Sequence, residues 1–155
     1  MKIGVRQDAA MSAGALFDAM ARRPPVEQFG GRAGISVERL DDLAAPGRGM
    51  RWRLRFAYLG RDYESETRLT RFERAEAMEF EGAAGGLTTR WRLDLIPLSP
   101  AMTRLALTVE PRAGSLAGRA LLQGLKLRRA RIEERLGSFL GDYVRRLERG
   151  AGPGA

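Results

Sequence analysis

The chain has 155 residues and a formal net charge of +8, and hydrophobic and charged residues make up 44% and 30% of it. This composition is typical of one globular domain and excludes a disordered chain, and no apolar run reaches the roughly 18 residues that a membrane-spanning helix needs. Histidine and cysteine are both absent, which excludes the usual zinc sites, Ser-His triads and thiol nucleophiles, so we predict no catalytic residue, no metal site and no cofactor.

The N-terminal segment predicts a strand at residues 2–9 and then a short helix over GALFDAMARR, which Ser12 is suited to cap. Pro24-Pro25 ends this helix, and VEQF adds a second helical turn before the glycine-rich GGRAG. Charged residues interrupt the first segment of the chain, so this segment lacks the apolar stretch of a secretion signal. Without cysteine, no disulfide can form. We therefore expect a cytoplasmic protein.

The middle of the chain has a period of two, and the last part has a helical period. Alternating apolar residues between glycine and proline turns predict strands at 35–42, 50–59, 62–72, 77–83, 87–96 and 102–110. From about 115 to 148 one apolar stripe predicts a single long helix. The stripe consists of Leu121, Leu125, Ile132, Leu136, Phe139, Leu140, Tyr143 and Leu147. We expect one domain over 1–149 and a flexible tail over 150–155.

Residues 51–60, RWRLRFAYLG, place an arginine or an apolar side chain at alternate positions. Such a strand could grip nucleic acid or form one wall of an apolar pocket, and pairing it with its neighbours separates the two. We placed hairpin turns at Gly60-Arg61, at 73–76 and at Gly85-Gly86. These turns pair apolar residues with each other on one face: Tyr58–Tyr63, Phe56–Ser65, Leu54–Thr67, Trp52–Leu69, Leu69–Phe80, Phe80–Trp91 and Met78–Leu93.

The same three turns pair arginines with carboxylates on the other face: Arg55–Glu66, Arg68–Glu81, Glu81–Arg90 and Glu79–Arg92. A slip of one residue would turn each apolar set to the wrong face, so the agreement is informative about register. The arginines thus have partners on a solvated face. We predict a pocket wall and no specific nucleic-acid partner.

This order of elements resembles the START-like, or SRPBCC, superfamily. The segments that carry the resemblance are ALFDAM after the first strand, APGRGMRWRLRF before the third, YESETRLTRFE, MEFEG and TRWRLDLIPLSPAMTRLALTVEP in the sheet, and LLQGLKLRRARIEERLGSFLGDYVRRLE at the end. The resemblance implies an α+β helix-grip fold. Its curved antiparallel sheet of about seven strands wraps around a long C-terminal helix, with two short helices between strands 1 and 2 and a cavity between sheet and helix.

Proteins of that superfamily mostly bind hydrophobic small molecules, and some are aromatase/cyclases. The resemblance therefore implies non-catalytic binding, transport or sensing of a hydrophobic small molecule, such as a lipid, an isoprenoid quinone or a polyketide-like compound. One alternative is a cyclase-like enzyme that uses the same cavity. The iron chemistry of related oxygenases does not carry over, because no histidine is present to hold the metal.

We predict that the ligand contacts the inward faces of the strands and of the helix. The predicted ligand-binding residues are Trp52, Leu54, Phe56, Tyr58, Tyr63, Ser65, Thr67, Leu69, Phe80, Thr89, Trp91, Leu93, Leu107, Leu121 and Leu125. Five of these carry hydroxyl groups, and buried hydroxyls need hydrogen-bonding partners, which a ligand can supply. The competing interpretation is that all of these side chains pack together as a filled core.

The predicted C-terminal helix concentrates the positive charge, because residues 119–149 contain nine basic and four acidic side chains. A basic amphipathic helix can lie on an anionic membrane or meet an acidic partner. This gives a further alternative, an interaction protein with a filled core that docks through this helix. Paired carboxylates such as Asp41-Asp42 are interpreted as surface charge, and the sequence predicts no oligomeric state.

Overall fold

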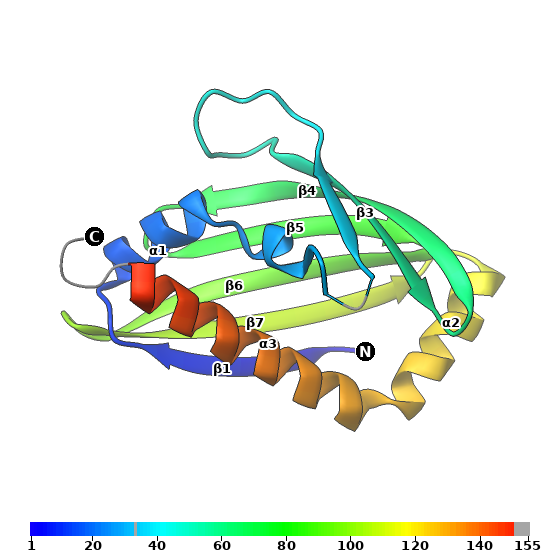
Figure 1. The fold of residues 1–155 in the computed structure, drawn as a ribbon. Helices are drawn as coiled ribbons and strands as arrows, with labels where there is room; N and C mark the ends of the chain where they lie inside the picture. Colours follow the sequence, from blue (N-terminus) through cyan, green and yellow to red (C-terminus); the bar gives the residue numbers. More distant parts are fainter. Residues whose placement is uncertain (33, 151–155) are drawn as a thin grey trace.

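The computed structural model describes residues 1–32 and 34–150, and within them seven antiparallel strands form one sheet in the order β1-β7-β6-β5-β4-β3-β2 (Figure 1). The strands are β1 (Ile3–Ala9), β2 (Ser36–Arg39), β3 (Arg51–Tyr58), β4 (Arg61–Glu73), β5 (Ala77–Ala84), β6 (Leu87–Ser99) and β7 (Met102–Ala113). The helical elements are α1 (Ala13–Arg22), the 3-10 helix η1 (Pro25–Phe29), α2 (Leu116–Leu127) and α3 (Arg129–Gly150). Each predicted strand is present. Of the predicted tail over 150–155, Gly150 is the last residue of α3, and residues 151–155 lie outside the described residues.

The N-terminal prediction is confirmed in its details. Ser12 caps α1, because its hydroxyl accepts a hydrogen bond of 3.2 Å from the backbone N–H of Ala15. The buried face of α1 carries Leu16, Phe17 and Met20. The two short helical elements between β1 and β2 are therefore α1 and η1.

The β5–β6 hairpin has the predicted register throughout. Phe80 lies opposite Trp91 and Glu81 opposite Arg90, and the Arg90 and Glu81 side chains form an ion pair at 3.5 Å. Gly85 and Gly86 have φ values of +60° and +80°, as a type I′ turn requires at both central residues. Two adjacent glycines thus set this register without backbone strain.

The predicted β3–β4 register was wrong by two residues. The turn lies at Leu59 and Gly60, with φ values of +51° and +74°, so Leu54 faces Ser65 and Phe56 faces Tyr63. The prediction placed glycine first in the turn, whereas this type I′ turn takes glycine second and holds a leucine in the left-handed region. A shift of two residues preserves the faces, so the inward and outward sets stay as predicted.

The β4–β5 hairpin has the predicted pairs Leu69–Phe80 and Arg68–Glu81, followed by a register shift between Leu69 and Arg71. That irregularity carries the pairing on to Glu73 and Ala77. The connecting loop is therefore shorter than the predicted segment 73–76, because one extra residue is absorbed within β4.

The single long helix predicted over 115–148 is two helices that meet at Arg128. This residue leaves the helical conformation with φ −108° and ψ 15°. A straight helix over that range would be about 50 Å long. Instead α2 contacts β6 and β7, and α3 crosses the sheet to pack on β1 and α1, as Figure 1 shows. The bend allows both segments to follow a curved sheet, which periodicity alone does not report.

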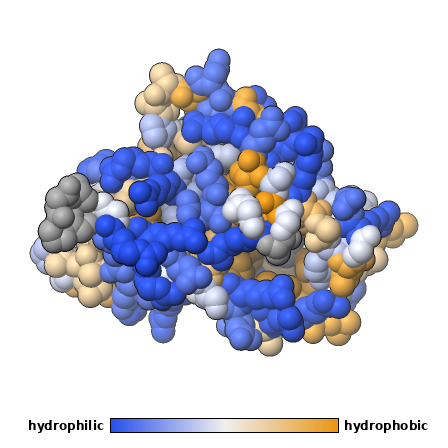
Figure 2. Space-filling model, viewed as in Figure 1, coloured by the Kyte–Doolittle hydropathy of each residue, from blue (hydrophilic) through white to orange (hydrophobic). Residues whose placement is uncertain are grey.

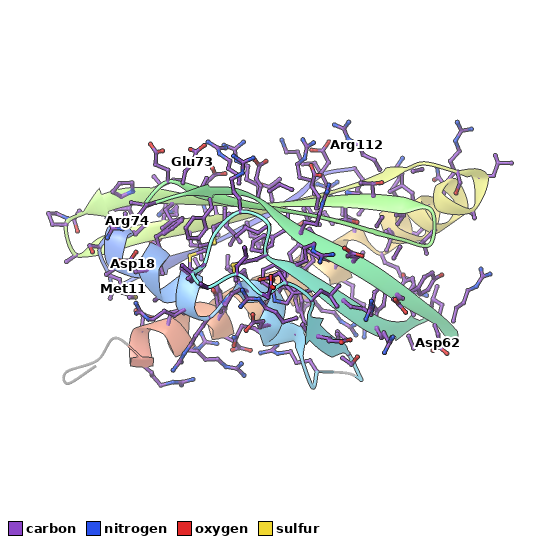
Figure 3. All side chains as sticks on the ribbon, turned by 90° about the horizontal axis from the view of Figure 1, so that it is seen from above. Met11, Asp18, Asp62, Glu73, Arg74 and Arg112 are labelled. Atoms are coloured by element: carbon purple, nitrogen blue, oxygen red, sulfur yellow. The ribbon has the colours of Figure 1, made fainter. Side chains whose placement is uncertain are left out.

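The helices cover one face of the sheet, and the other face is charged. In Figure 3, Glu73 and Arg112 point away from the helical layer, whereas Asp18 of α1 lies beside Arg74 of the β4–β5 loop. The Arg74 guanidinium contacts the Asp18 carboxylate at 2.9 Å. This ion pair links α1 to the β4–β5 loop, at the end of the molecule where the core is filled.

Candidate functional site: a cavity between the sheet and α2

A cavity of about 280 Å³ lies between the helices α2 and α3 and the parts of β3–β7 beneath them. Its walls are largely apolar, with hydroxyl groups at a few positions. It is lined by Leu54, Phe56, Tyr58, Tyr63, Ser65, Thr67, Gly82, Ala83, Ala84, Leu87, Thr89, Trp91, Val109, Leu121, Leu125 and Leu136. Apolar walls with a few converging polar groups are typical of small-molecule sites.

A row of hydroxyls crosses the sheet wall of the cavity. Thr67, Gly82 and Thr89 are neighbours on three successive strands, and Ser65 lies two residues from Thr67 on the same face. The Ser65 Oγ and Thr67 Oγ1 atoms are 3.4 Å apart, and both side chains are buried. The one weak hydrogen bond between them leaves further capacity for a polar group of a ligand.

Gly82 keeps this row accessible. A Cβ atom at position 82 would lie 2.8 Å from Thr67 Oγ1 and 3.0 Å from Ser65 Oγ. Any side chain there would press on the two hydroxyls and fill part of the cavity. The sequence signal was present, because the correct β4–β5 and β5–β6 registers place a glycine between two threonines.

The Tyr58 hydroxyl is the second polar feature. Its oxygen is buried and has no hydrogen-bond partner among the described residues. Leaving a buried hydroxyl unpaired costs about 1–3 kcal/mol. A ligand with a hydrogen-bonding atom near Tyr58 would remove that cost. The tyrosine and the Ser65–Thr67 pair are thus two polar positions on a largely apolar wall that also carries Tyr63 and Thr89.

The position of α2 above the cavity is set by close backbone packing. Ser115 caps the helix by accepting a 3.0 Å hydrogen bond from the Gly118 N–H. A Cβ atom on Gly118 would lie 2.1 Å from the carbonyl oxygen of Gly86. Only glycine permits this approach, which brings Leu121 and Leu125 over the sheet as the outer wall of the cavity.

Ten of the predicted ligand-binding residues line the cavity: Leu54, Phe56, Tyr58, Tyr63, Ser65, Thr67, Thr89, Trp91, Leu121 and Leu125. The other five pack in the core instead: Trp52, Leu69, Phe80, Leu93 and Leu107. They point inward as predicted, but η1, α1 and α3 cover that part of the sheet. The Trp52 ring, for example, lies 5.8 Å from that of Phe80 and donates from Nε1 to Glu27 of η1 at 3.0 Å.

Sequence reasoning missed six lining residues: Gly82, Ala83, Ala84, Leu87, Val109 and Leu136. Most are small or lie at strand ends, where alternation gives a weak signal. Trp91 stands at the boundary of the cavity, because its ring meets Phe29 edge-on at 4.9 Å and Phe29 in turn stacks on Phe139 at 4.7 Å. These three rings separate the hollow region from the filled core.

The strongly perturbed ionisable groups lie away from the cavity. Burial raises the pKa of Tyr143 well above its usual value, and its hydroxyl donates to the Arg23 carbonyl at 2.6 Å. The hydrogen bond from Arg39 lowers the pKa of Asp41, and the backbone N–H groups of Arg51 and Leu43 add to this. Asp41 therefore has a structural role that the interpretation as surface charge missed.

No acid, amine or guanidinium is among the residues that line the cavity. Within residues 1–32 and 34–150, no three carboxylates gather as a metal site would require. No helix in the same ranges is long and apolar enough to cross a membrane. The arrangement is therefore suited to enclosing an apolar molecule and hydrogen-bonding it through a few hydroxyl groups.

Solved structures resemble this one over nearly the whole chain. A protein from Thermus thermophilus matches with a TM-score of 0.68 and 15% identity, covering 99% of this chain and 100% of its own. The Zhui aromatase/cyclase from a Streptomyces species gives 0.66 and 17%, covering 98% of both chains. A START superfamily protein from Mycobacterium smegmatis gives 0.66 and 14%, covering 94% of this chain and 98% of its own.

The chain has a START-like helix-grip fold. No family model and no curated protein matches the sequence, so the similarity is one of architecture at low identity. Norcoclaurine synthase from Thalictrum flavum shares the fold at a TM-score of 0.65 and 12% identity, over 95% of this chain and 85% of its own, in a complex with dopamine and hydroxybenzaldehyde.

Proposed function

We propose that this START-like protein binds a hydrophobic small molecule in the cavity beneath α2 and carries or senses it without chemical change. The observation that carries the proposal is the cavity itself, a hollow of about 280 Å³ with largely apolar walls and a few hydroxyl-bearing side chains. Closing an apolar surface over a ligand in this way gives affinity through the hydrophobic effect, and the hydroxyls fix its orientation.

The volume of the cavity limits the size of the ligand that it can hold. Ligand pockets usually measure about 300–1,000 Å³, so this one suits a compact molecule such as a small aromatic ring system or a short isoprenoid quinone headgroup. A whole phospholipid would require the α2 side to open. The polar positions at Tyr58 and at Ser65 with Thr67 favour a ligand that carries one or two oxygen functions on an apolar skeleton.

A cyclase-like reaction is the alternative, supported by the fold shared with an aromatase/cyclase. General acid–base catalysis near neutral pH most often uses histidine, and uses carboxylates, lysines and tyrosines less often. The cavity wall offers only hydroxyls. We therefore favour binding without catalysis, and product analysis after incubation with a bound polyketide-like compound would distinguish the two.

Intrinsic fluorescence tests the proposal directly, because Trp91 lines the cavity and Trp52 is packed in the core. In the Trp52→Phe variant, Trp91 is the sole reporter, and we expect saturable quenching or a blue shift on titration with fatty acids, isoprenoid quinones or flat polyaromatics. The Trp91→Phe variant is the matched control and should respond weakly. No saturable response from any class in the parent protein would contradict the proposal.

A further inference from the structure

The outward side of α2 exposes two leucines that no part of residues 1–32 or 34–150 covers. Leu116 is 80% exposed and Leu127 is 89% exposed. They are eleven residues apart, about three helical turns, so they lie on the same side of the helix. Leu121 and Leu125 lie on the opposite side and line the cavity. Thus α2 has an apolar inner face and, on its solvent-facing side, two separate exposed leucines.

The same segment is strongly basic. Residues 116–131 contain Arg119, Lys126, Arg128, Arg129 and Arg131 and no carboxylate. None of these five forms an ion pair within the described residues, whereas most arginines on the outer sheet face do, as in Arg53–Glu64, Arg68–Glu81 and Arg104–Asp8. Arg129 alone of the five has a side-chain hydrogen bond, to the Lys2 carbonyl at 2.8 Å. The positive charge of residues 116–131, which cover α2 and the start of α3, is therefore not neutralised by ion pairs within the described residues.

A third exposed leucine lies at the same end of the molecule. Leu59, 65% exposed, occupies the β3–β4 turn next to Tyr58, which lines the cavity. Figure 1 shows this turn and α2 at one end of the fold, and Figure 2 shows hydrophobic surface gathered there among hydrophilic atoms. Exposed leucines thus lie on both sides of the cavity.

We propose that α2 docks this end of the protein onto an anionic lipid surface. A bilayer accepts separate leucines that insert individually between lipids, while unpaired arginine and lysine side chains attract anionic headgroups. A protein partner would instead require a contiguous complementary patch, and these leucines stand apart along the helix. The proposal goes beyond ligand binding and does not depend on it, although it would place the cavity wall at the membrane.

Vesicle co-sedimentation tests this docking. We expect binding to phosphatidylcholine vesicles that contain phosphatidylglycerol, weak binding to pure phosphatidylcholine vesicles, and a decline as salt rises. Leu127→Gln should reduce binding about tenfold, and the double variant Arg119→Gln, Lys126→Gln should reduce it by at least about tenfold. All of these side chains are exposed, so thermal unfolding should be unchanged.

Two matched controls make the test specific. Leu98→Gln removes an exposed leucine near the end of β6, away from α2, and should leave vesicle binding unchanged. Arg68→Gln, Arg90→Gln removes the same charge from the outer sheet face and should reduce binding less than twofold. Equal losses in the two charge variants would overturn the proposal in favour of general attraction.

The remaining outcomes are also decisive. No binding to anionic vesicles would overturn the lipid proposal and leave an acidic protein as the partner of α2. The tryptophan titration without vesicles is independent of these results, because the substituted residues do not line the cavity. If the protein binds ligand but no vesicles, only the docking proposal is contradicted. If it binds vesicles but no ligand, only the proposed function is contradicted.

Discussion

The layer between sheet and helices is filled at one end and hollow at the other. At the filled end, α1 inserts Leu16, Phe17 and Met20, and α3 adds Leu140 and Tyr143. At the hollow end α2 and Leu136 of α3 cover the sheet, and the sheet beneath them carries small residues at Gly82, Ala83 and Ala84. The two ends share the same strands and the same alternation of inward and outward side chains. The cavity therefore results from the smaller side-chain volume at the hollow end.

The largest expected effect comes from truncating one residue at each end. Phe17 is fully buried, and its ring packs 4.9 Å from Phe72. Phe17→Ala should lower the free energy of unfolding by about 3–5 kcal/mol. Leu121→Ala should cost about 1 kcal/mol, because the methyl groups removed already border an empty space. Urea unfolding measures both, and similar losses would show that the cavity is closed in solution.

A larger side chain should be tolerated at the hollow end and should destabilise the filled end. Leu125→Trp should abolish the saturable tryptophan response at nearly unchanged stability, because the indole can occupy the cavity. The same increase in volume at the filled end, as in Leu140→Trp, should cost about 1–3 kcal/mol and leave ligand binding intact in the folded fraction. If Leu125→Trp destabilises the protein as much as Leu140→Trp does, the core is filled at both ends and the interaction-protein alternative gains support.

Sequence reasoning found which residues point inward, but it could not find where the layer is hollow. Alternation and hairpin pairing placed Trp52 and Trp91 on the same face, and both do point inward. Trp52 is nevertheless in the core because η1 covers it through Glu27. Whether a helix covers a given inward residue depends on the bend at Arg128 and on the contact of Gly118 with Gly86, and neither has a periodic signature.

Acid should weaken the loop beside the filled end. The Asp41 carboxylate accepts hydrogen bonds from Arg39 at 2.8 and 2.9 Å and from the Arg51 N–H at 2.8 Å, so its pKa is lower in the folded protein. Its contribution to stability is present above the unfolded pKa of about 3.9 and is lost as the pH falls through the folded pKa.

Substitution isolates that contribution. We expect Asp41→Asn to lower the free energy of unfolding at pH 7 by about 1.5–3 kcal/mol, the usual range for hydrogen bonds to a charged group. The difference from the parent should shrink as the pH falls below about 4, where the unfolded carboxyl takes up its proton. Asp42→Asn, at the exposed neighbour, is the control and should have little effect. A difference that stays constant down to a pH of about 2 would show that the carboxylate charge has no role.

The hydroxyl row should affect ligand affinity more than stability. Thr67→Val keeps the shape of the side chain and removes the hydroxyl beside Ser65. Affinity for a ligand with an oxygen function should fall about fivefold to tenfold, which corresponds to the net value of one hydrogen bond, about 1 kcal/mol. Thr108→Val, on the outward face of β7, is the matched control. Equal changes in affinity for both would exclude the row from the binding site.

The smallest effect tests the register of the charged face. Arg90 and Glu81 lie opposite each other at 3.5 Å, and Glu81 also contacts Arg68 at 3.7 Å. Because the Arg90 side chain is 53% exposed, a double-mutant cycle with Arg90→Gln and Glu81→Gln should give a coupling of only about 0.2–1 kcal/mol. The shared partner explains why the charge reversal Arg90→Glu would be a poorer test, since the compensating Glu81→Arg would face Arg68. A coupling of zero at low salt would contradict the pairing, and one that declines with added salt is expected for a solvated ion pair.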